Sequence, residues 1–432
     1  MKIELAETYR DTDVGREAEA LLRPCVQCGQ CTFTCPTFRL LDDEWDGPRG
    51  RIYLIKQMLE GKPPDASFLL PAYSLDTLAG RALGANVQHH LDRCLGCRSC
   101  ETSCPQGVRY GRLLDIGREL AEKAAPRPLR EKLARRAVRA VVPHRRRFTT
   151  LLRTGQTLRR VLPATLRARI PQRREAGAWP DRAHARTMLI WQGCVQPGLA
   201  PDINAAAARV LDRFGIRLTP ASDGCCGALS HHMGETDEAR AFMRRNIDAL
   251  WPHVEAGAEA IVLTASGCGM HFRDYGELLD DDPRYRDKAK RVAELARDIA
   301  EIVAEEWKEA LPAPERPRRI AFQSSCSLQH GEKLNGVVES LLKRAGFKLV
   351  PVSYPFMCCG SAGSYSLLQR QLSESLRARK METLLAARPQ AIATANIGCL
   401  NHLSEVSPVP VSHWIELLDE AFAAAGDSRG PA

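Results

Sequence analysis

Residues 25–36 read CVQCGQCTFTCP, and residues 94–105 read CLGCRSCETSCP. Each stretch has four cysteines spaced C-x2-C-x2-C-x3-C and followed by proline, the run by which bacterial two-cluster proteins bind 4Fe-4S clusters. A zinc ribbon instead uses paired C-x2-C knuckles and has no role for a third and fourth cysteine at these offsets. The two runs predict two 4Fe-4S clusters in the N-terminal third of the chain and a role in electron transfer.

The spacing also predicts how the two runs share their ligands. In two-cluster proteins the first three cysteines of a run hold one cluster and the fourth ligates the other. We therefore expect one cluster on Cys25, Cys28, Cys31 and Cys104, and a second on Cys94, Cys97, Cys100 and Cys35. The segment between the runs contains a helical stretch, 51–60, which a compact β-type ferredoxin lacks. An α-helical ferredoxin domain over residues 1–121 is the predicted fold.

The other eight cysteines belong to an internal repeat. Cys194, Cys225, Cys226 and Cys268 recur as Cys326, Cys358, Cys359 and Cys399, at offsets of 132, 133, 133 and 131 residues. The surrounding text recurs too, as in DGCCGALS at 223–230 and MCCGSAGS at 357–364. The expected strands are 188–191, 217–220, 260–264, 320–323, 348–352 and 391–395, and the expected helices are 203–214, 237–253, 332–345 and 367–387.

This alternation is β-α-β-α-β twice, which predicts a duplicated α/β region with parallel sheets, one cysteine-rich domain at 187–311 and another at 312–426. Parallel strands present their carboxyl ends at one edge of the sheet. Because cysteine follows each predicted strand, four thiols should converge in each copy. A bridge between vicinal cysteines would be strained, since adjacent Cα atoms lie about 3.8 Å apart and disulfides prefer at least about 4.4 Å. Three interpretations stay open: a further iron–sulfur or metal site, redox thiols, and buried inert thiols.

Positive charge is concentrated in residues 122–186, which we interpret as a basic linker. Lys123 to Arg186 contain 19 Lys and Arg against 3 Asp and Glu, although the chain of 432 residues carries only +9. Leucine and valine alternate with these arginines. Such helices lie on anionic membranes, bind acidic partner surfaces or are simply solvated. No nucleic-acid motif accompanies them, so no nucleic-acid partner is expected.

The N-terminus, MKIELAETYRDTDVG, has neither the basic start nor the apolar run of a signal peptide, and no window approaches 18 uninterrupted apolar residues. We expect a cytoplasmic protein, with peripheral contact to the inner face of the cytoplasmic membrane as a further hypothesis. Sixteen cysteines in a reducing compartment favour metal or redox chemistry over structural disulfides. No G-x-G-x-x-G follows a strand and no P-loop occurs, so the chain shows no dinucleotide-binding or phosphate-binding fingerprint.

Longer stretches resemble a known family: CVQCGQCTFTCPTFRLLDDEWDGPRGRIYLIKQMLEG, HLDRCLGCRSCETSCPQGV, SDGCCGALSHHMG, TANIGCLNHL and PVSHWIELL. They resemble the iron–sulfur subunits of glycolate oxidase, in which a two-cluster ferredoxin domain precedes two CCG domains like those of heterodisulfide reductase. The resemblance implies that FAD-containing partner subunits oxidise glycolate to glyoxylate. This chain would pass the electrons to quinone or another membrane acceptor and would contain no catalytic residue. The alternatives are a lactate or glycerol-3-phosphate dehydrogenase subunit and a thiol–disulfide enzyme.

Histidines stand at several informative positions. The reductase pattern ends each repeat in a C-x2-C pair, whereas this chain has His271 after Cys268 and His402 after Cys399. Each imidazole is a candidate metal ligand, or a histidine that hydrogen-bonds backbone or solvent. The pairs at 89–90 and 231–232 are candidates to tune a cluster or lie near a quinone, or are ordinary surface residues.

Overall fold

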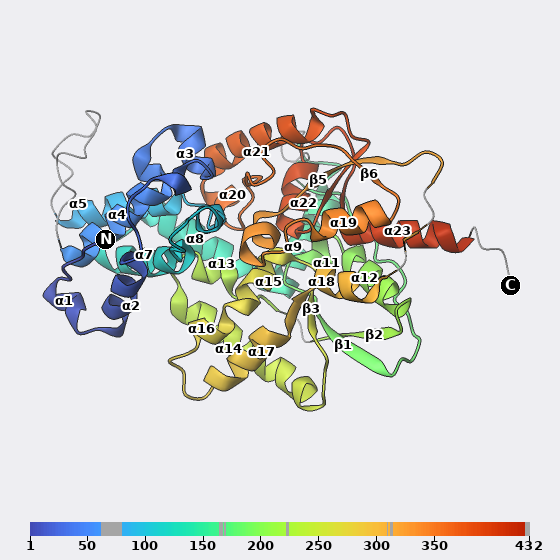
Figure 1. The fold of residues 1–432 in the computed structure, drawn as a ribbon, viewed down its shortest axis with the longest axis horizontal. Helices are drawn as coiled ribbons and strands as arrows, with labels where there is room; N and C mark the ends of the chain where they lie inside the picture. Colours follow the sequence, from blue (N-terminus) through green and yellow to red (C-terminus); the bar gives the residue numbers. More distant parts are fainter. Residues whose placement is uncertain are drawn as a thin grey trace. The chain divides into compact units, whose positions relative to one another are not determined.

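The computed structural model describes residues 1–61, 80–163, 167, 170–221, 224–308, 310–311 and 314–427 (Figure 1). The chain forms two compact units. The first unit comprises Met1–Ala137, Ser230–Thr236 and Phe356–Leu376. The second unit comprises Val138–Leu229, Asp237–Pro355 and Arg377–Ala432.

Each unit groups segments that are distant in sequence, and the domain ranges 1–121, 122–186, 187–311 and 312–426 stay predictions. The border between the two units falls inside the expected linker, between residues 137 and 138. The first unit also includes one short segment from each cysteine-rich copy, Ser230–Thr236 and Phe356–Leu376. The expected boundary at residue 312 lies outside the described residues. The units are defined by packing in space. The amino-acid composition of a segment therefore does not indicate to which unit it belongs.

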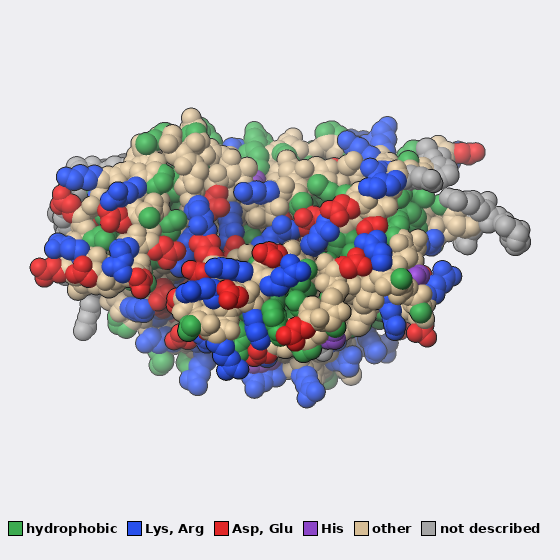
Figure 2. Space-filling model, turned by 60° about the horizontal axis from the view of Figure 1, so that its bottom comes forward, with side chains coloured by type: hydrophobic (Ala, Val, Ile, Leu, Met, Phe, Trp, Pro, Cys, Tyr) green, Lys and Arg blue, Asp and Glu red, His purple; other side chains and the backbone are tan. Residues whose placement is uncertain are grey.

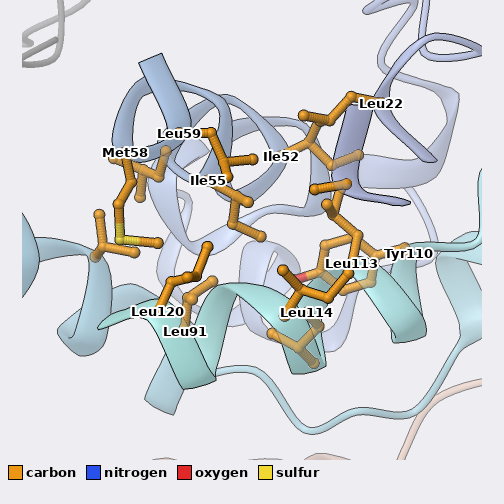
Figure 3. Packing of buried hydrophobic residues seen from close by; sticks show 14 of the residues in the cluster. Leu22, Ile52, Ile55, Met58, Leu59, Leu91, Tyr110, Leu113, Leu114 and Leu120 are labelled. Carbon is orange, nitrogen blue, oxygen red and sulfur yellow. The ribbon is translucent and has the colours of Figure 1, made fainter. Parts of the chain in front are cut away.

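The first unit is helical, as predicted. Its N-terminal elements are α1 (Glu7–Arg10), α2 (Asp13–Leu22), η1 (Gln30–Thr32), α3 (Pro36–Leu41), η2 (Glu44–Asp46), α4 (Pro48–Glu60), α5 (Gly80–Asp92), α6 (Ser99–Thr102) and α7 (Tyr110–Ala124). The expected helix at 51–60 lies within α4, which begins with proline and ends at Gly61 in a left-handed conformation. Figure 3 shows α4 and α7 facing each other through Ile55, Leu113 and Leu114. These side chains are at most 2 % exposed, so this core holds the segments that bear the eight ferredoxin-type cysteines.

The second unit contains two parallel sheets, which confirms the predicted duplicated α/β region. The strand orders are β2-β1-β3-β4 and β6-β5-β7-β8, and every pairing is parallel. The strands are β1 (Arg186–Trp191), β2 (Ile216–Pro220), β3 (Ile261–Leu263), β4 (Ala296–Asp298), β5 (Arg319–Gln323), β6 (Lys348–Leu349), β7 (Ala391–Thr394) and β8 (Val411–His413). Its helices are α9 (Arg145–Leu158), α11 (Gln196–Leu199), α12 (Asp202–Asp212), α14 (Thr236–Glu255), α15 (Ser266–Arg273), α16 (Tyr275–Leu278), α17 (Arg286–Leu295), α18 (Ile299–Glu306), η5 (Ser327–Gly331), α19 (Val337–Arg344), α22 (Ile397–Ser404) and α23 (Trp414–Asp427).

Sequence analysis missed three features of the second unit and its neighbourhood. The strands β4 and β8 add a fourth strand to each sheet. Each has only three residues and runs directly into a helix, which leaves no period-2 signal. The helix expected at 332–345 begins only at Val337, after a π-helical turn and Gly336, and the helix expected at 367–387 is divided into α20 (Tyr365–Leu368) and α21 (Arg370–Leu385).

Hydrogen bonds join the two sheet copies at the ends of their strands. Ser266, after β3, lies 2.7 Å from the hydroxyl of Ser327, which follows β5. The side-chain amide of Asn396, after β7, donates to both hydroxyls at 3.3 Å. The carboxyl edges of the two sheets therefore meet, as the repeated topology requires for a shared functional edge.

The buried carboxyl group of Glu332 lies at the same junction, against α15. The side chain of Glu332 is fully buried, and a Cβ atom added to Gly269 on α15 would lie 2.0 Å from its Oε1. Burial, reinforced by the charge of Asp298, raises the pKa of Glu332 well above its usual range. The nearest cation is the guanidinium of Arg273, whose Nε lies 3.8 Å away. Burial in this position therefore favours the protonated, uncharged form of the Glu332 carboxyl group.

Glu332→Gln should flatten the pH dependence of stability. A carboxyl group with a raised folded-state pKa contributes its full stability below its ordinary pKa and loses it as pH rises through the folded-state value. The parent should therefore lose stability between pH 5 and pH 8 that the variant keeps, at about 1.4 kcal/mol for each unit by which the pKa is shifted. Urea unfolding at both pH values measures this. The exposed Glu420→Gln variant is the control, and parallel profiles for the parent and Glu332→Gln would contradict the assignment.

Candidate cluster and cysteine sites

The eight N-terminal cysteines line two separate cavities in the first unit. The first cavity is lined by Cys25, Cys28, Cys31 and Cys104, together with Cys100. The second is lined by Cys35, Cys94, Cys97 and Cys100. Each cavity thus combines three cysteines of one run with the fourth cysteine of the other, which is the arrangement expected from the spacing.

Left-handed backbone turns shape both cysteine runs in the same way. Gln27 and Gly29 have φ values of 58° and 79°, and their counterparts Gly96 and Arg98 have 62° and 55°. Each turn reverses the chain between cysteines, so that successive thiols face one cavity. At the second cavity the Gly96 amide donates to the Cys94 Sγ at 3.4 Å and the Tyr110 hydroxyl donates to it at 3.6 Å.

The electrostatics of these cavities suit a bound cation. Burial and the neighbouring thiols Cys25 and Cys104 raise the pKa of Cys31 to about 12, and burial raises that of Cys100 strongly. Several thiolates can coexist there only when positive charge lies among them. No disulfide involves any of the sixteen cysteines, all of which lie in described segments. The donor set therefore fits an iron–sulfur cluster in each cavity.

Arg51 supplies a buried positive charge beside the second cavity. Its side chain is 1 % exposed, and its Nη1 lies 3.1 Å from the Thr37 hydroxyl and 3.9 Å from the Cys35 Sγ. Asp46 holds it from the other side at 3.3 Å and also faces the His90 Nδ1 at 3.1 Å. Sequence analysis singled out His90 but missed Arg51 and Asp46, because no spacing rule places a helix arginine against a thiol.

The first repeat brings its four cysteines together in the second unit. Cys194 follows β1, Cys225 and Cys226 follow β2, and Cys268 lies on α15. Hydrogen bonds join Cys194 to Cys225, Cys225 to Cys226, and Cys226 to Cys268. The hydrogen bonds from Cys194 and Cys226 hold the pKa of Cys225 well below its usual range. The same bonds to Cys225, together with burial, raise the pKa of Cys194 and of Cys226. One thiolate is thus stabilised among protonated thiols, a set that can bind metal or react as a nucleophile.

The glycine of each CCG motif is required by the backbone. Gly227 has φ +99° and its amide donates to the Cys225 Sγ at 3.4 Å. Gly360 has φ +90° and its amide donates to the Cys358 Sγ at the same distance. A Cβ atom would lie 3.0 Å from the Ala239 carbonyl oxygen in the first copy and 2.5 Å from that of Ser373 in the second. Only glycine combines this positive φ with such close backbone neighbours.

Residues that sequence analysis missed support the first CCG turn. Asn246 on α14 donates to the Cys225 carbonyl at 2.8 Å and to the Tyr275 hydroxyl at 2.9 Å. The Tyr275 hydroxyl in turn donates to the Cys226 carbonyl at 2.6 Å. The candidate ligand His271 lies edge-on to Tyr275, with ring centroids 5.7 Å apart, and its Nε2 is 3.4 Å from the position of a Cβ on Gly227. The structure therefore brings His271 to the CCG turn.

The cysteines of the second repeat are distributed between the two units. Cys326 immediately precedes η5 and Cys399 lies on α22, both in the second unit, whereas Cys358 and Cys359 belong to the first. His402 is one turn after Cys399 on α22 and is 6 % exposed. Cys358, Cys359 and Cys399 are also buried, so all three thiols are shielded from water.

One histidine of each pair is buried, whereas His89 is exposed and His232 is half-buried. His90 is fully buried in the Asp46 network, and His231 is 5 % exposed. The Nδ1 atoms of His231 and His232 lie 3.9 and 4.0 Å from the carboxylate oxygens of Asp115 on α7. Burial lowers the pKa of His232 to about 3, so its imidazole is neutral at neutral pH.

In the described part of the basic linker, α8 (Leu129–Val141) is followed by α9. On α9 and just beyond it, Leu151 is 62 % exposed and Val161 is 78 % exposed. A groove beside them is lined by Arg153, Arg159, Arg160, Arg167 and Arg173. Figure 2 shows that basic side chains also gather along the lower edge of one face. Among the described residues, no helix is long and apolar enough to cross a membrane.

Comparisons with known proteins agree with these sites. Residues 21–108 match the family model of a 4Fe-4S dicluster domain, and residues 188–273 and 320–404 each match that of a cysteine-rich domain, CCG. These matches confirm the predicted cofactor class and the duplicated cysteine-rich region.

Named relatives and one solved structure extend the comparison. The chain is 47 % identical to the glycolate oxidase iron-sulfur subunit of Escherichia coli, over 98 % of this chain and 99 % of that one. It is 29 % identical to a probable glycolate oxidase iron-sulfur subunit of Bacillus subtilis over 89 % of both chains. It is 24 % identical to lactate utilization protein A of Exiguobacterium, over 55 % of this chain and 99 % of that one. A hypothetical protein from Helicobacter pylori has a similar fold, with a TM-score of 0.51 at 11 % identity, over 97 % of this chain and 74 % of that one.

Gly227→Ala should destabilise the second unit by about 1–3 kcal/mol, because alanine is strained at this φ and its Cβ presses on the Ala239 carbonyl. Urea unfolding of the full chain measures the loss. Gly257→Ala is the matched control, since Gly257 has φ +87° but no atom within 4 Å of an added Cβ. Equal losses in the two variants would show that the contact behind the CCG turn contributes nothing.

Proposed function

The chain belongs to the family of glycolate oxidase iron-sulfur subunits, and from that premise we propose that it is the electron-transfer subunit of a glycolate-oxidising complex. Its partner would be an FAD-containing subunit that oxidises glycolate to glyoxylate. That oxidation releases two electrons and two protons, and this chain would carry the electrons towards quinone.

The pair of cysteine-lined cavities in the first unit carries this proposal. Each cavity draws thiols from both runs, and Cys100 lines both. Two redox centres built this close together suit transfer of single electrons through the chain. A 4Fe-4S cluster, when bound, accepts and releases one electron at a time at a potential set by charge, hydrogen bonds and exposure.

The proposed ligands are those expected from the spacing: Cys25, Cys28, Cys31 and Cys104 for one cluster, and Cys94, Cys97, Cys100 and Cys35 for the other. The surrounding residues hold negative charge in place. Arg49 lines the first cavity. Its hydrogen bond to Glu44 is the largest cause that raises its pKa, and the negative charges of Glu44, Cys31 and Cys28 raise it further. Arg51 likewise faces Cys35 at the second cavity. Buried guanidinium groups offset thiolate charge without admitting water.

The cysteine-rich repeats are proposed to form a further metal or redox site. In the first copy, the hydrogen-bonded set of Cys194, Cys225, Cys226 and Cys268 supports this role, and His271 at the same turn is a candidate fifth ligand. In the second copy the corresponding set is Cys326, Cys358, Cys359 and Cys399, with His402. A thiol–disulfide enzyme is the second candidate function, favoured by the stabilised thiolate at Cys225. It predicts thiol–disulfide turnover without any flavin subunit.

The substrate of the complex is fixed by its partner. The similarity to lactate utilization protein A supports a lactate-oxidising complex as the alternative, and a glycerol-3-phosphate complex would use the same electron path. Peripheral contact with an anionic membrane is supported by the exposed leucines and the arginine-lined groove around α9, because apolar side chains among arginines suit the lipid interface.

Single Cys→Ser variants should fall into two spectroscopic groups. Cys104→Ser should alter the same EPR signal as Cys28→Ser, and Cys35→Ser the same signal as Cys97→Ser, because each pair would ligate one cluster. Anaerobically purified protein, reduced stepwise, gives the spectra. The Cys226→Ala/Cys359→Ala variant serves as the comparison and should keep both signals. If Cys104→Ser instead altered the signal lost in Cys97→Ser, each run would bind its own cluster.

Reconstitution tests the function as a whole. The chain alone should show no glycolate oxidation, and adding the FAD subunit should give glycolate-dependent reduction of a soluble dye. Removing the clusters by Cys28→Ser and Cys97→Ser together should strongly lower quinone reduction, because the proposed electron path runs through both clusters. Lactate and glycerol 3-phosphate are offered in parallel. Preference for either would assign the chain to the corresponding complex, and activity of the chain alone would contradict its role as a carrier.

A further inference from the structure

Arg51 directs a buried positive charge at the second cysteine cavity. It lies in the first turn of α4, lines that cavity and is 1 % exposed, so its charge faces protein and not water. Its Nε donates to the His90 carbonyl at 2.7 Å, and its Nη2 donates to the Asp46 Oδ1 at 3.3 Å. Its Nη1 faces the Cys35 Sγ at 3.9 Å. The two outer contacts therefore fix the guanidinium in one orientation towards the sulfur.

The neighbouring hydroxyl of Thr37 does not replace this contact. Its Oγ1 lies 2.8 Å from the Asp46 carbonyl oxygen, 3.1 Å from the Arg51 Nη1 and 3.3 Å from the Cys35 Sγ. A hydroxyl group has a single proton, and the shortest of these contacts assigns it to the carbonyl oxygen. Thr37 then accepts from Arg51. Among the described residues, this leaves the guanidinium as the donor that faces a deprotonated Cys35.

A buried carboxylate balances the guanidinium from the other side. Asp46 is 0 % exposed, and its Oδ2 accepts from the Arg93 Nη1 at 2.6 Å. Its Oδ1 lies 3.1 Å from the His90 Nδ1. Burial opposes ionisation, but the hydrogen bond with His90 and the charge of Arg51 together lower the pKa of Asp46. Cys35 is therefore close to one positive and one negative charge that water screens only weakly.

The first cavity has a differently placed arginine. Arg49 lines it from the same helix, two residues before Arg51, but its side chain is 34 % exposed. Its Nε lies 2.6 Å from the Oε1 of Glu44, which is itself partly exposed. Water and this partner screen the charge of Arg49. Helix α4 thus presents one arginine to each cavity, and Arg51 is the one that is shielded from water.

We infer that Arg51 and Asp46 set the reduction potential of the cluster in the second cavity, Arg51 raising it and Asp46 lowering it. The inference rests on the proposed ligand set, in which Cys35 holds that cluster. Reduction adds one electron, which the partner flavin would supply, and no bond forms or breaks. The added negative charge is stabilised by a nearby cation and destabilised by a nearby anion. Both side chains are positioning residues, since neither touches a substrate.

A redox titration of the full, iron-loaded chain, followed by EPR, tests this inference. Arg51→Gln should weaken reduction of the centre whose signal Cys97→Ser alters by about tenfold, a drop of about 59 mV for one electron. Asp46→Asn should raise the same midpoint potential. The signal that Cys28→Ser alters should keep its potential in both variants. Loosened packing does not predict shifts of opposite sign, so the signs separate an effect of charge from a merely structural one.

Matched variants complete the test. Arg51→Lys keeps the charge and should recover part of the potential lost in Arg51→Gln. Arg49→Gln should shift only the signal of the first cavity, and Arg16→Gln, which breaks an exposed ion pair with Asp13, should shift neither. If Arg51→Gln loses its iron, the Arg51→Gln/Asp46→Asn double variant leaves no buried charge unpaired and is compared with Asp46→Asn. The double variant should then have the lower potential.

Three results would overturn the inference: shifts of the same sign in Arg51→Gln and Asp46→Asn, a shift confined to the signal of the first cavity, or equal potentials in the double variant and Asp46→Asn. Glycolate-dependent dye reduction by the reconstituted complex decides the proposed function separately. Dye reduction with unshifted potentials would contradict the inference alone. The expected shifts without dye reduction by the parent complex would contradict the proposed function alone.

Discussion

Buried thiols cannot all lose their protons unless positive charge lies among them, and the first unit is organised around this constraint. In its two cysteine cavities, burial together with neighbouring thiols raises the pKa of Cys31 and Cys100. Iron bound in the cavities, with guanidinium groups such as Arg51 beside them, would instead favour the deprotonated thiolates. The helical core in Figure 3 holds the two runs in register, so each cavity receives sulfur from both.

The cysteine-rich repeats also bring several thiols close together, but they do so with parallel sheets instead of helices. Parallel strands deliver thiols to the carboxyl edge of a sheet, and a glycine in each CCG motif turns its amide back onto the first sulfur. In the first copy this gathers four thiols in the second unit. In the second copy the vicinal cysteines belong to the first unit instead, so the two copies share a motif without sharing its surroundings.

The two cysteine cavities of the first unit have the same cysteine spacing but different electrostatic surroundings. Arg51 beside the second cavity is 1 % exposed, whereas Arg49 beside the first is 34 % exposed. Water therefore screens the charge of Arg49 more than that of Arg51. Two centres of one chemical type can differ in potential for this reason, although their ligands are spaced alike.

The sequence alone determined those features of this protein that depend on the spacing of residues along the chain. Cysteine offsets predicted the cluster type and the sharing of ligands, and the repeat of 131–133 residues predicted two parallel sheets. The sequence did not predict the short strands β4 and β8, because three residues are too few to show a period-2 pattern. Only the tertiary structure decided what depends on distant contacts: the burial of Arg51 against Cys35 and the support of the CCG turn by Asn246 and Tyr275. These rest on side chains from separate segments that meet only when the core has packed, and no local pattern records such meetings.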